Sequence, residues 1–122
     1  IYAHCLGLGV GFIIKHTKET NMDKEWRRIL DEDRDWDYAY LFIILKHKLE
    51  HMSKMFKSEH AFALHSEDRA AEMDIVIDAL NRLIEDNYIM DYDSYDQMQE
   101  AQSKDLDLAF DTMKENVLGW WD

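Results

Sequence analysis

Two histidines one helical turn apart are the first residues in this chain that could carry chemistry. His47 and His51 stand four residues apart in an apolar stretch of helical period, so both rings can reach one metal ion. Glu50, His60 or His65 would supply a third ligand. The same pair also fits a polar helix face, because the lysines around it repel a cation. We expect no bound metal or other cofactor, and a metal-dependent helical hydrolase is one alternative function.

Three other motifs fall short of a site. Asp91–Asp96 is rich in carboxylates, but an EF-hand calcium loop needs glycine at its sixth position and glutamate at its twelfth, where this chain has Asp96 and Gln102. The glycines of residues 7–11 lack the spacing of a dinucleotide-binding fingerprint. Cys5 has no base held in place by a third group, and as the single cysteine it excludes an internal disulfide. We therefore predict no catalytic residue and a protein that is not an enzyme.

Carboxylates on the last predicted helix are the most informative feature. Asp107, Asp111 and Glu115 recur every fourth residue, about 5–6 Å apart on a helix. A nucleic-acid strand carries one phosphate per about 3.4 Å of rise, so a ridge on this scale can occupy a basic groove that normally tracks a phosphate backbone. The alternative interpretation is a solvated face of an acidic protein. The predicted partner-binding residues on the last helix are Asp96, Glu100, Asp107, Asp111 and Glu115, and Lys104 is the only basic residue that interrupts them. Two more are predicted on the preceding helix, Asp78 and Glu85. Asp74 and Asp86 on that helix are expected to widen the acidic surface.

The longest apolar pattern in the chain must position these groups. Apolar residues at steps of three and four run from Asp35 to Phe56 and predict a helix ending near Lys57. Its first half, from Tyr38 to Leu45, is apolar nearly all round, which a helix tolerates when other helices surround it. We therefore expect the stretch from Asp35 to Phe56 to form the central helix of a bundle. Either Asp33 or Asp35 is expected to cap it.

The other helices are predicted from caps and apolar stripes. They run from Asn21 to about Leu30, from Ser66 to about Tyr88, and from a Ser94–Gln97 capping box to a C-cap at Gly119. The stripe of the last helix thins between Gln99 and Asp105, which allows a kink there. Trp120 and Trp121 indicate a docked C-terminus, since two adjacent indoles are costly to leave in water.

The predicted fold class is all-α, a small bundle of three main helices plus a short N-terminal helix. The chain has 122 residues, no proline and four glycines, so little in its composition breaks a helix after residue 12. The predicted division is an apolar, glycine-rich arm and connector over residues 1–20 and a helical bundle domain over 21–122.

Charge is distributed unevenly along the chain. Residues 61–122 hold four basic and sixteen acidic residues, which accounts for the whole formal net charge of −12. Residues 1–60 are balanced, with ten of each sign. An acidic half of this kind disfavours direct contact with nucleic acid or an anionic membrane and favours a basic partner.

The first fourteen residues are apolar and spaced with glycine. Small residues recur every fourth position, as in closely packed membrane helices, but a bilayer span needs about 20 residues. We expect a packed or partner-bound arm. Contact of residues 1–14 with a membrane, in a virion or membrane-associated structural protein, is a second alternative.

Three short motifs resemble a group of small bacteriophage proteins. They are Arg34-Asp35-Trp36-Asp37-Tyr38 before the apolar helix, Leu83-Ile84-Glu85-Asp86-Asn87-Tyr88 at a helix end, and the terminal Gly119-Trp120-Trp121-Asp122. The resemblance covers residues 33–122 and assigns no catalytic residue. What it implies is a viral origin, and hence a protein that engages host machinery or assembles in the virion.

The function predicted from these features is that of a phage-encoded, acidic helical interaction protein. Its acidic half would bind a host protein through a basic surface, such as the nucleic-acid channel of a CRISPR effector or another defence complex, by mimicking nucleic acid. The expected location is the cytoplasm of the infected bacterial host.

Overall fold

The structure, a computed structural model, describes residues 20–62 and 64–121. These residues form helices joined by short turns, with no β-strand among them. The prediction of an all-α fold is confirmed. The chain divides into two compact units, Ile1–Glu32 and Asp33–Asp122, so the boundary falls after the first described helix.

In the first unit, α3 (Asn21–Glu32) begins with a capping box. The Thr20 hydroxyl accepts a hydrogen bond from the Asp23 backbone N–H at 3.0 Å, and the Asp23 carboxylate accepts one from the Thr20 backbone N–H at 2.9 Å. The two bonds satisfy amides that the helix start would leave open. The predicted cap at Asn21 is therefore wrong by one residue.

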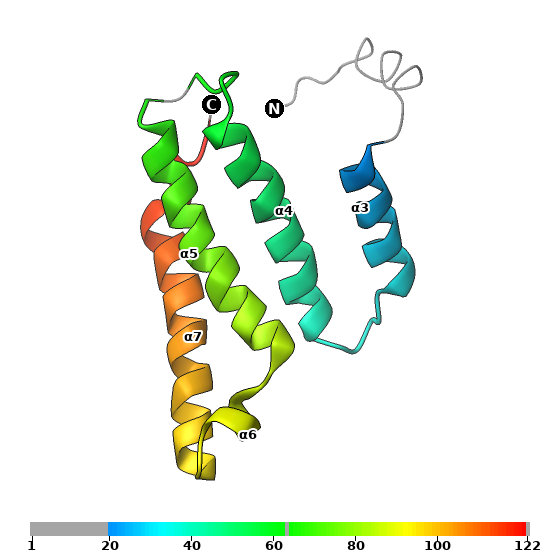
Figure 1. The fold of residues 1–122 in the computed structure, drawn as a ribbon, viewed down its shortest axis with the longest axis vertical. Coiled ribbons are helices and arrows are strands. Elements are labelled where there is room, and N and C mark those ends of the chain that lie inside the picture. The colour runs from blue at the N-terminus through cyan, green and yellow to red at the C-terminus, as the bar shows by residue number, and fades with distance from the viewer. Residues whose placement is uncertain (1–19, 63, 122) are drawn as a thin grey trace. The chain divides into compact units, whose positions relative to one another are not determined.

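The second unit is built from three long helices, one short helix and one 3₁₀ turn. They are α4 (Ala39–Lys57), α5 (Ser66–Glu85), α6 (Tyr88–Asp91), α7 (Tyr95–Asn116) and the 3₁₀ turn η1 (Val117–Gly119). In Figure 1 the long helices run alternately up and down, with α5 between α4 and α7. Because α5 packs against both neighbours, it is the central helix. The prediction that the stretch from Asp35 to Phe56 holds that place is wrong: α4 lies at one side, and its Leu41 is 70% exposed.

The core lies along α5. Met73, Val76 and Leu80 are fully buried, and each such side chain stabilises the fold by about 1.5–3 kcal/mol relative to exposure. Alanines stand at close helix contacts on α5 and α7, where a side chain of one carbon lets backbones approach. The remaining buried core residues are Leu49 and Phe56 from α4, Ala70, Ala79 and Leu83 from α5, and Tyr88, Ala109 and Trp120.

The ends of α4 and α7 differ from the predictions in instructive ways. Tyr38 holds the N-cap position of α4 without a side-chain capping bond, and the preceding Asp37, not Asp33 or Asp35, accepts the Ala39 N–H through its Oδ1 at 2.9 Å. The Ser94 cap of α7 is confirmed, because its hydroxyl accepts the Gln97 N–H at 3.2 Å. The sequence also allowed a break between Gln99 and Asp105, and none occurs, because α7 is continuous from Tyr95 to Asn116.

The ends of α5 carry the two left-handed residues found in the described backbone. His65 has φ 58° and holds the N-cap position of α5, so Ser66, predicted as the cap, is the first helical residue. Asp86 has φ 53° and ends the helix. After Asp86, Tyr88–Asp91 form the short helix α6.

The C-terminus folds back on the beginning of α5. Trp120 is 6% exposed, and its indole N–H donates to Glu72 Oε1 at 3.0 Å. Glu72 also pairs with Arg69 at 3.2 Å. The prediction of a docked terminus is confirmed for Trp120, whereas Trp121 is 73% exposed. Gly119 lies in a 3₁₀ turn without a left-handed φ, so its predicted role as a helix C-cap glycine is wrong.

Candidate functional site

The outer face of α7 carries the ridge of carboxylates predicted from the sequence. Ala109 on the opposite face is fully buried, and Met98, Ala101 and Met113 pack against the core beside it. The period of the helix therefore turns the ridge toward solvent. All five of its residues are exposed: Asp96, Glu100, Asp107, Asp111 and Glu115.

Two cations stand beside this ridge. Lys104 Nζ lies 3.5 Å from Glu100 Oε1, so one carboxylate of the ridge is paired. Lys114 is also exposed and lies three residues after Asp111, a neighbour on the helix surface that the sequence prediction left out. Asp107 and Asp111 lie between these two cations along the helix.

The two predicted residues on α5 are exposed but belong to another helix. Glu85 accepts a hydrogen bond from Asn81 at 3.0 Å, and Asp78 lies one turn before Arg82. No hydrogen bond or ion pair within residues 20–62 and 64–121 joins Asp78 or Glu85 to the α7 ridge. The five α7 residues share one helix face, whereas Asp78 and Glu85 lie on α5 and are not bonded to them.

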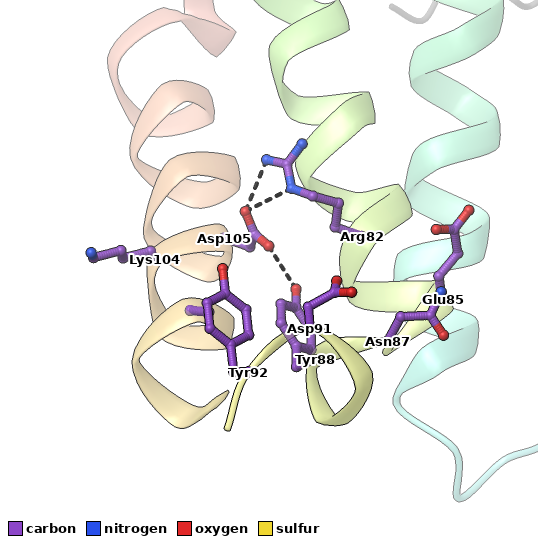
Figure 2. A pocket seen from close by; sticks show the side chains of 9 residues that line it. Arg82, Glu85, Asn87, Tyr88, Asp91, Tyr92, Lys104 and Asp105 are labelled. Carbon is purple, nitrogen blue, oxygen red and sulfur yellow. Dashed lines mark hydrogen bonds and ion pairs between the residues drawn. The ribbon is translucent and has the colours of Figure 1, made fainter. Parts of the chain in front are cut away.

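An aspartate on the inner side of α7 was missed by the sequence reasoning. Figure 2 shows Arg82 reaching from α5 to Asp105, with Tyr88 below them. Asp105 Oδ1 accepts a hydrogen bond from Arg82 Nε at 2.9 Å and forms an ion pair with Arg82 Nη2 at 2.8 Å. Asp105 Oδ2 accepts a hydrogen bond from the Tyr88 hydroxyl at 2.7 Å. This network ties α5, α6 and α7 together. One signal in the sequence was available: Asp105 stands four residues from both Ala101 and Ala109, on the apolar side of the helix.

The same residues line a pocket of ≈ 260 Å³ where α5, α6 and α7 meet. Its cations are Arg82, which is held by Asp105, and Lys104, which Figure 2 shows extending to the outer side of α7. Its carboxylates include Glu85 and Asp91. Because the central charges of the pocket are paired with each other, the network fits a structural role better than ligand binding.

Tyr88 provides a pH-dependent test of this network. Burial first, and then the hydrogen bond to the Asp105 carboxylate, raises the pKa of Tyr88 above its ordinary value of 10.0. A raised folded-state pKa means that the stabilisation is fully present below pH 10 and is lost as pH rises through the folded pKa. We expect the difference between alkaline titrations of wild type and Tyr88→Phe, followed by phenolate absorbance, to appear only above pH 10. A difference centred at or below pH 10 would contradict the network.

A second polar cluster lies between α4 and α5. Asp74 accepts hydrogen bonds from the buried Ser53 hydroxyl and from Lys57, both at 2.6 Å. Burial alone would raise the pKa of Asp74, but these bonds, with the Lys57 charge, lower it below the ordinary value. A groove of ≈ 550 Å³ runs past the cluster. Asp74 is thus engaged within the fold and does not widen an acidic docking surface as predicted.

The two histidines of α4 do face each other. Their Nε2 atoms are 3.2 Å apart, and the rings meet edge to face with centroids 4.7 Å apart. Glu50 lies 3.7 Å from Nδ1 of His47, the ring nitrogen that faces away from His51. In the part of the chain that the structure describes, no three His, Cys, Asp or Glu residues are grouped to hold a metal. Glu50 contacts His47 at the other ring nitrogen, so neither it nor His60 or His65 joins the two histidines as a third metal ligand.

Two further expectations concern the N-terminal residues. Cys5 and the apolar arm of residues 1–14 lie outside the described residues. Among the helices that are described, none combines the length and hydrophobicity needed to cross a bilayer.

Comparisons of this chain with protein-family models, with curated proteins and with solved structures gave no match.

Proposed function

We propose that this protein is a phage-encoded interaction protein whose α7 ridge binds a basic, nucleic-acid-binding surface of a host protein. The observation that carries the proposal is the placement of five exposed carboxylates along one face of a single continuous helix. The proposal treats α4, α5 and α7 as a three-helix bundle that holds this helix rigid, with α3 as the short N-terminal helix.

The linear charge density of the ridge indicates which kind of groove it fits. From Asp96 to Glu115 the helix rises about 28 Å at about 1.5 Å per residue, so the five charges stand about 7 Å apart on average, with the widest gap, about 10.5 Å, between Glu100 and Asp107. A single nucleic-acid strand carries one charge per about 3.4 Å, and a duplex carries twice that density. The ridge thus matches about half the charge of one strand. This favours a narrow groove for a single strand over a duplex-binding surface.

The viral setting of the proposal comes from the three motifs shared with small bacteriophage proteins. A phage gains from occupying the nucleic-acid channel of a host defence complex, such as a CRISPR effector, and such complexes are located in the host cytoplasm. Because the ridge is itself negative, direct nucleic-acid binding by this half of the chain is disfavoured by charge repulsion.

Charge reversal tests the proposal directly. In affinity capture from infected host cells, we expect Asp107→Lys, Asp111→Lys and Glu115→Lys together to weaken partner binding about 100-fold, since like charges then face each other across the interface. Binding of the unmodified protein is expected to fall with salt and to be competed by single-stranded DNA.

The matched control reverses three exposed carboxylates outside α7: Glu59, Glu67 and Asp93. This variant changes the net charge by the same amount, so it separates a specific ridge from general acidity. We expect it to keep most of the affinity. Equal losses in the two variants, or binding indifferent to salt and to single-stranded DNA, would refute mimicry by the ridge.

A further inference from the structure

The turn before α4 exposes two large aromatic side chains to solvent. Trp36 is 83% exposed and Tyr38 is 61% exposed, and Leu41 beside them is also exposed. Trp36 makes no ring contact with another aromatic residue in the described chain. Exposed patches of large apolar side chains usually mark contact surfaces.

These side chains line a pocket with a strongly acidic rim. The pocket has a volume of ≈ 420 Å³, and its lining consists of Asp33, Arg34, Asp35, Trp36, Asp37, Tyr38, Tyr40, Leu41 and Ile44. Three carboxylates stand against one guanidinium on the rim. Arg34 lies 4.0 Å from Asp37, whereas Asp33 and Asp35 form no hydrogen bond or ion pair within residues 20–62 and 64–121. Two negative charges therefore remain open beside three aromatic rings.

The backbone around the pocket is ordered by its own hydrogen bonds. The Asp37 carboxylate accepts a hydrogen bond from the Ala39 N–H at 2.9 Å. The backbone N–H of Asp37 donates a hydrogen bond to the Arg34 carbonyl at 3.1 Å. The Tyr38 ring meets Phe42 edge to face at 5.7 Å, and Phe42 packs against the core. The backbone of this turn and the Tyr38 ring are thus ordered before any ligand binds, which lowers the entropic cost of binding.

We propose that this pocket is a binding site for an arginine side chain of a basic partner segment. A planar guanidinium stacks on indole and phenol faces through cation–π attraction and forms paired hydrogen bonds with carboxylates, a combination that neither an apolar nor an anionic group offers. Trp, Tyr and Arg are also the residues enriched at the energetic centres of interfaces. The inference rests on the proposed function for the source of the arginine, since a basic partner would supply it.

The site differs from the other polar clusters in the second unit. In the pocket of Figure 2, Asp105 is already occupied by Arg82 and Tyr88, and in the α4–α5 groove Asp74 is occupied by Lys57 and Ser53. The pocket at Trp36 instead combines open carboxylates with exposed rings, so a cation from outside is the group that completes it.

Calorimetry with short capped peptides tests the site on the full chain. One peptide carries a single arginine between glycines, a second carries citrulline, which is neutral and of the same shape, and a third carries lysine. At physiological salt we expect the arginine peptide to bind about tenfold tighter than either of the others. We also expect it to shift the Trp36 indole N–H signal in NMR spectra.

The variants assign the binding to this pocket. Trp36→Ala is expected to weaken arginine-peptide binding about tenfold, and Trp36→Tyr to restore much of it. Trp121→Ala, which removes an indole of similar exposure at the C-terminus, is expected to leave binding unchanged. Equal binding of all three peptides, an unmoved Trp36 signal, or equal losses in Trp36→Ala and Trp121→Ala would each overturn the proposal.

The ridge variant keeps the two proposals separable. Because its three reversed residues lie on α7, it is expected to retain arginine-peptide binding while losing host-partner capture. Loss of capture with retained peptide binding supports both sites. Retained capture with retained peptide binding refutes the ridge alone, and absent peptide binding in every form refutes the arginine site alone.

Discussion

Replacing Trp120 with alanine is expected to lower the free energy of unfolding by about 3–5 kcal/mol, the range for large aromatic residues removed from a core. Trp120 is 6% exposed and belongs to the core cluster that joins α4, α5 and α7. The change would also remove the hydrogen bond from its indole to Glu72 and leave that half-buried carboxylate with Arg69 alone. Urea denaturation followed by far-ultraviolet circular dichroism measures the loss.

The neighbouring tryptophan supplies the control. Trp121 is 73% exposed, so Trp121→Ala is expected to change stability by less than about 0.5 kcal/mol. If the two variants were equally stable, the C-terminus would not be docked as the structure has it. Trp120→Phe, which keeps the apolar ring and loses the N–H, should fall between them.

Asp105→Ala is the second change with a large expected effect, about 2–3 kcal/mol of destabilisation. The Asp105 side chain is 14% exposed. Its removal leaves the buried Tyr88 hydroxyl without an acceptor and takes away the carboxylate that pairs with the Arg82 guanidinium. A hydrogen bond to a charged group is worth about 1.5–3 kcal/mol, and an unsatisfied buried polar group adds its own desolvation cost. Chemical denaturation again provides the measurement.

A double-mutant cycle with Tyr88→Phe isolates the hydrogen bond between these residues. Because the two side chains are in contact and the acceptor is a carboxylate, we expect their effects to be non-additive by about 1.5–3 kcal/mol. Asp107→Ala, two residues along on the exposed ridge, is the control and should stay within about 0.5 kcal/mol of wild type. Additive effects, or an equal loss in the Asp107 variant, would show that Asp105 does not anchor α7.

The contrast between Asp105 and Asp107 separates the scaffold from the candidate binding surface. Both are aspartates on one helix, but one points to the core and the other to solvent. Variants of the first should lose stability before binding, and variants of the ridge should lose binding with stability intact. Stability thus reports on the Asp105 network, and partner binding reports on the ridge.

Some features governed by short-range chemistry could be predicted from the sequence, although the caps predicted for α3, α4 and α5 were wrong. The start of α7 at Ser94 and the end of α4 at Lys57 follow from local capping and apolar period, and the composition alone excluded helix breakers. The solvent exposure of the α7 ridge also follows from period, because Ala109 and its neighbours leave only one face for the core. These outcomes need no knowledge of other elements.

What only the tertiary structure decided is which helix lies in the middle and which charges remain open. Hydropathy favoured the stretch from Asp35 to Phe56, but α5, with polar residues on its outer face, lies between its neighbours because burial depends on what packs against a helix. Likewise the sequence does not show which basic residues pair with Asp74 and Asp105. Their partners, Lys57 and Arg82, are 17 and 23 residues away, and only folding brings them together.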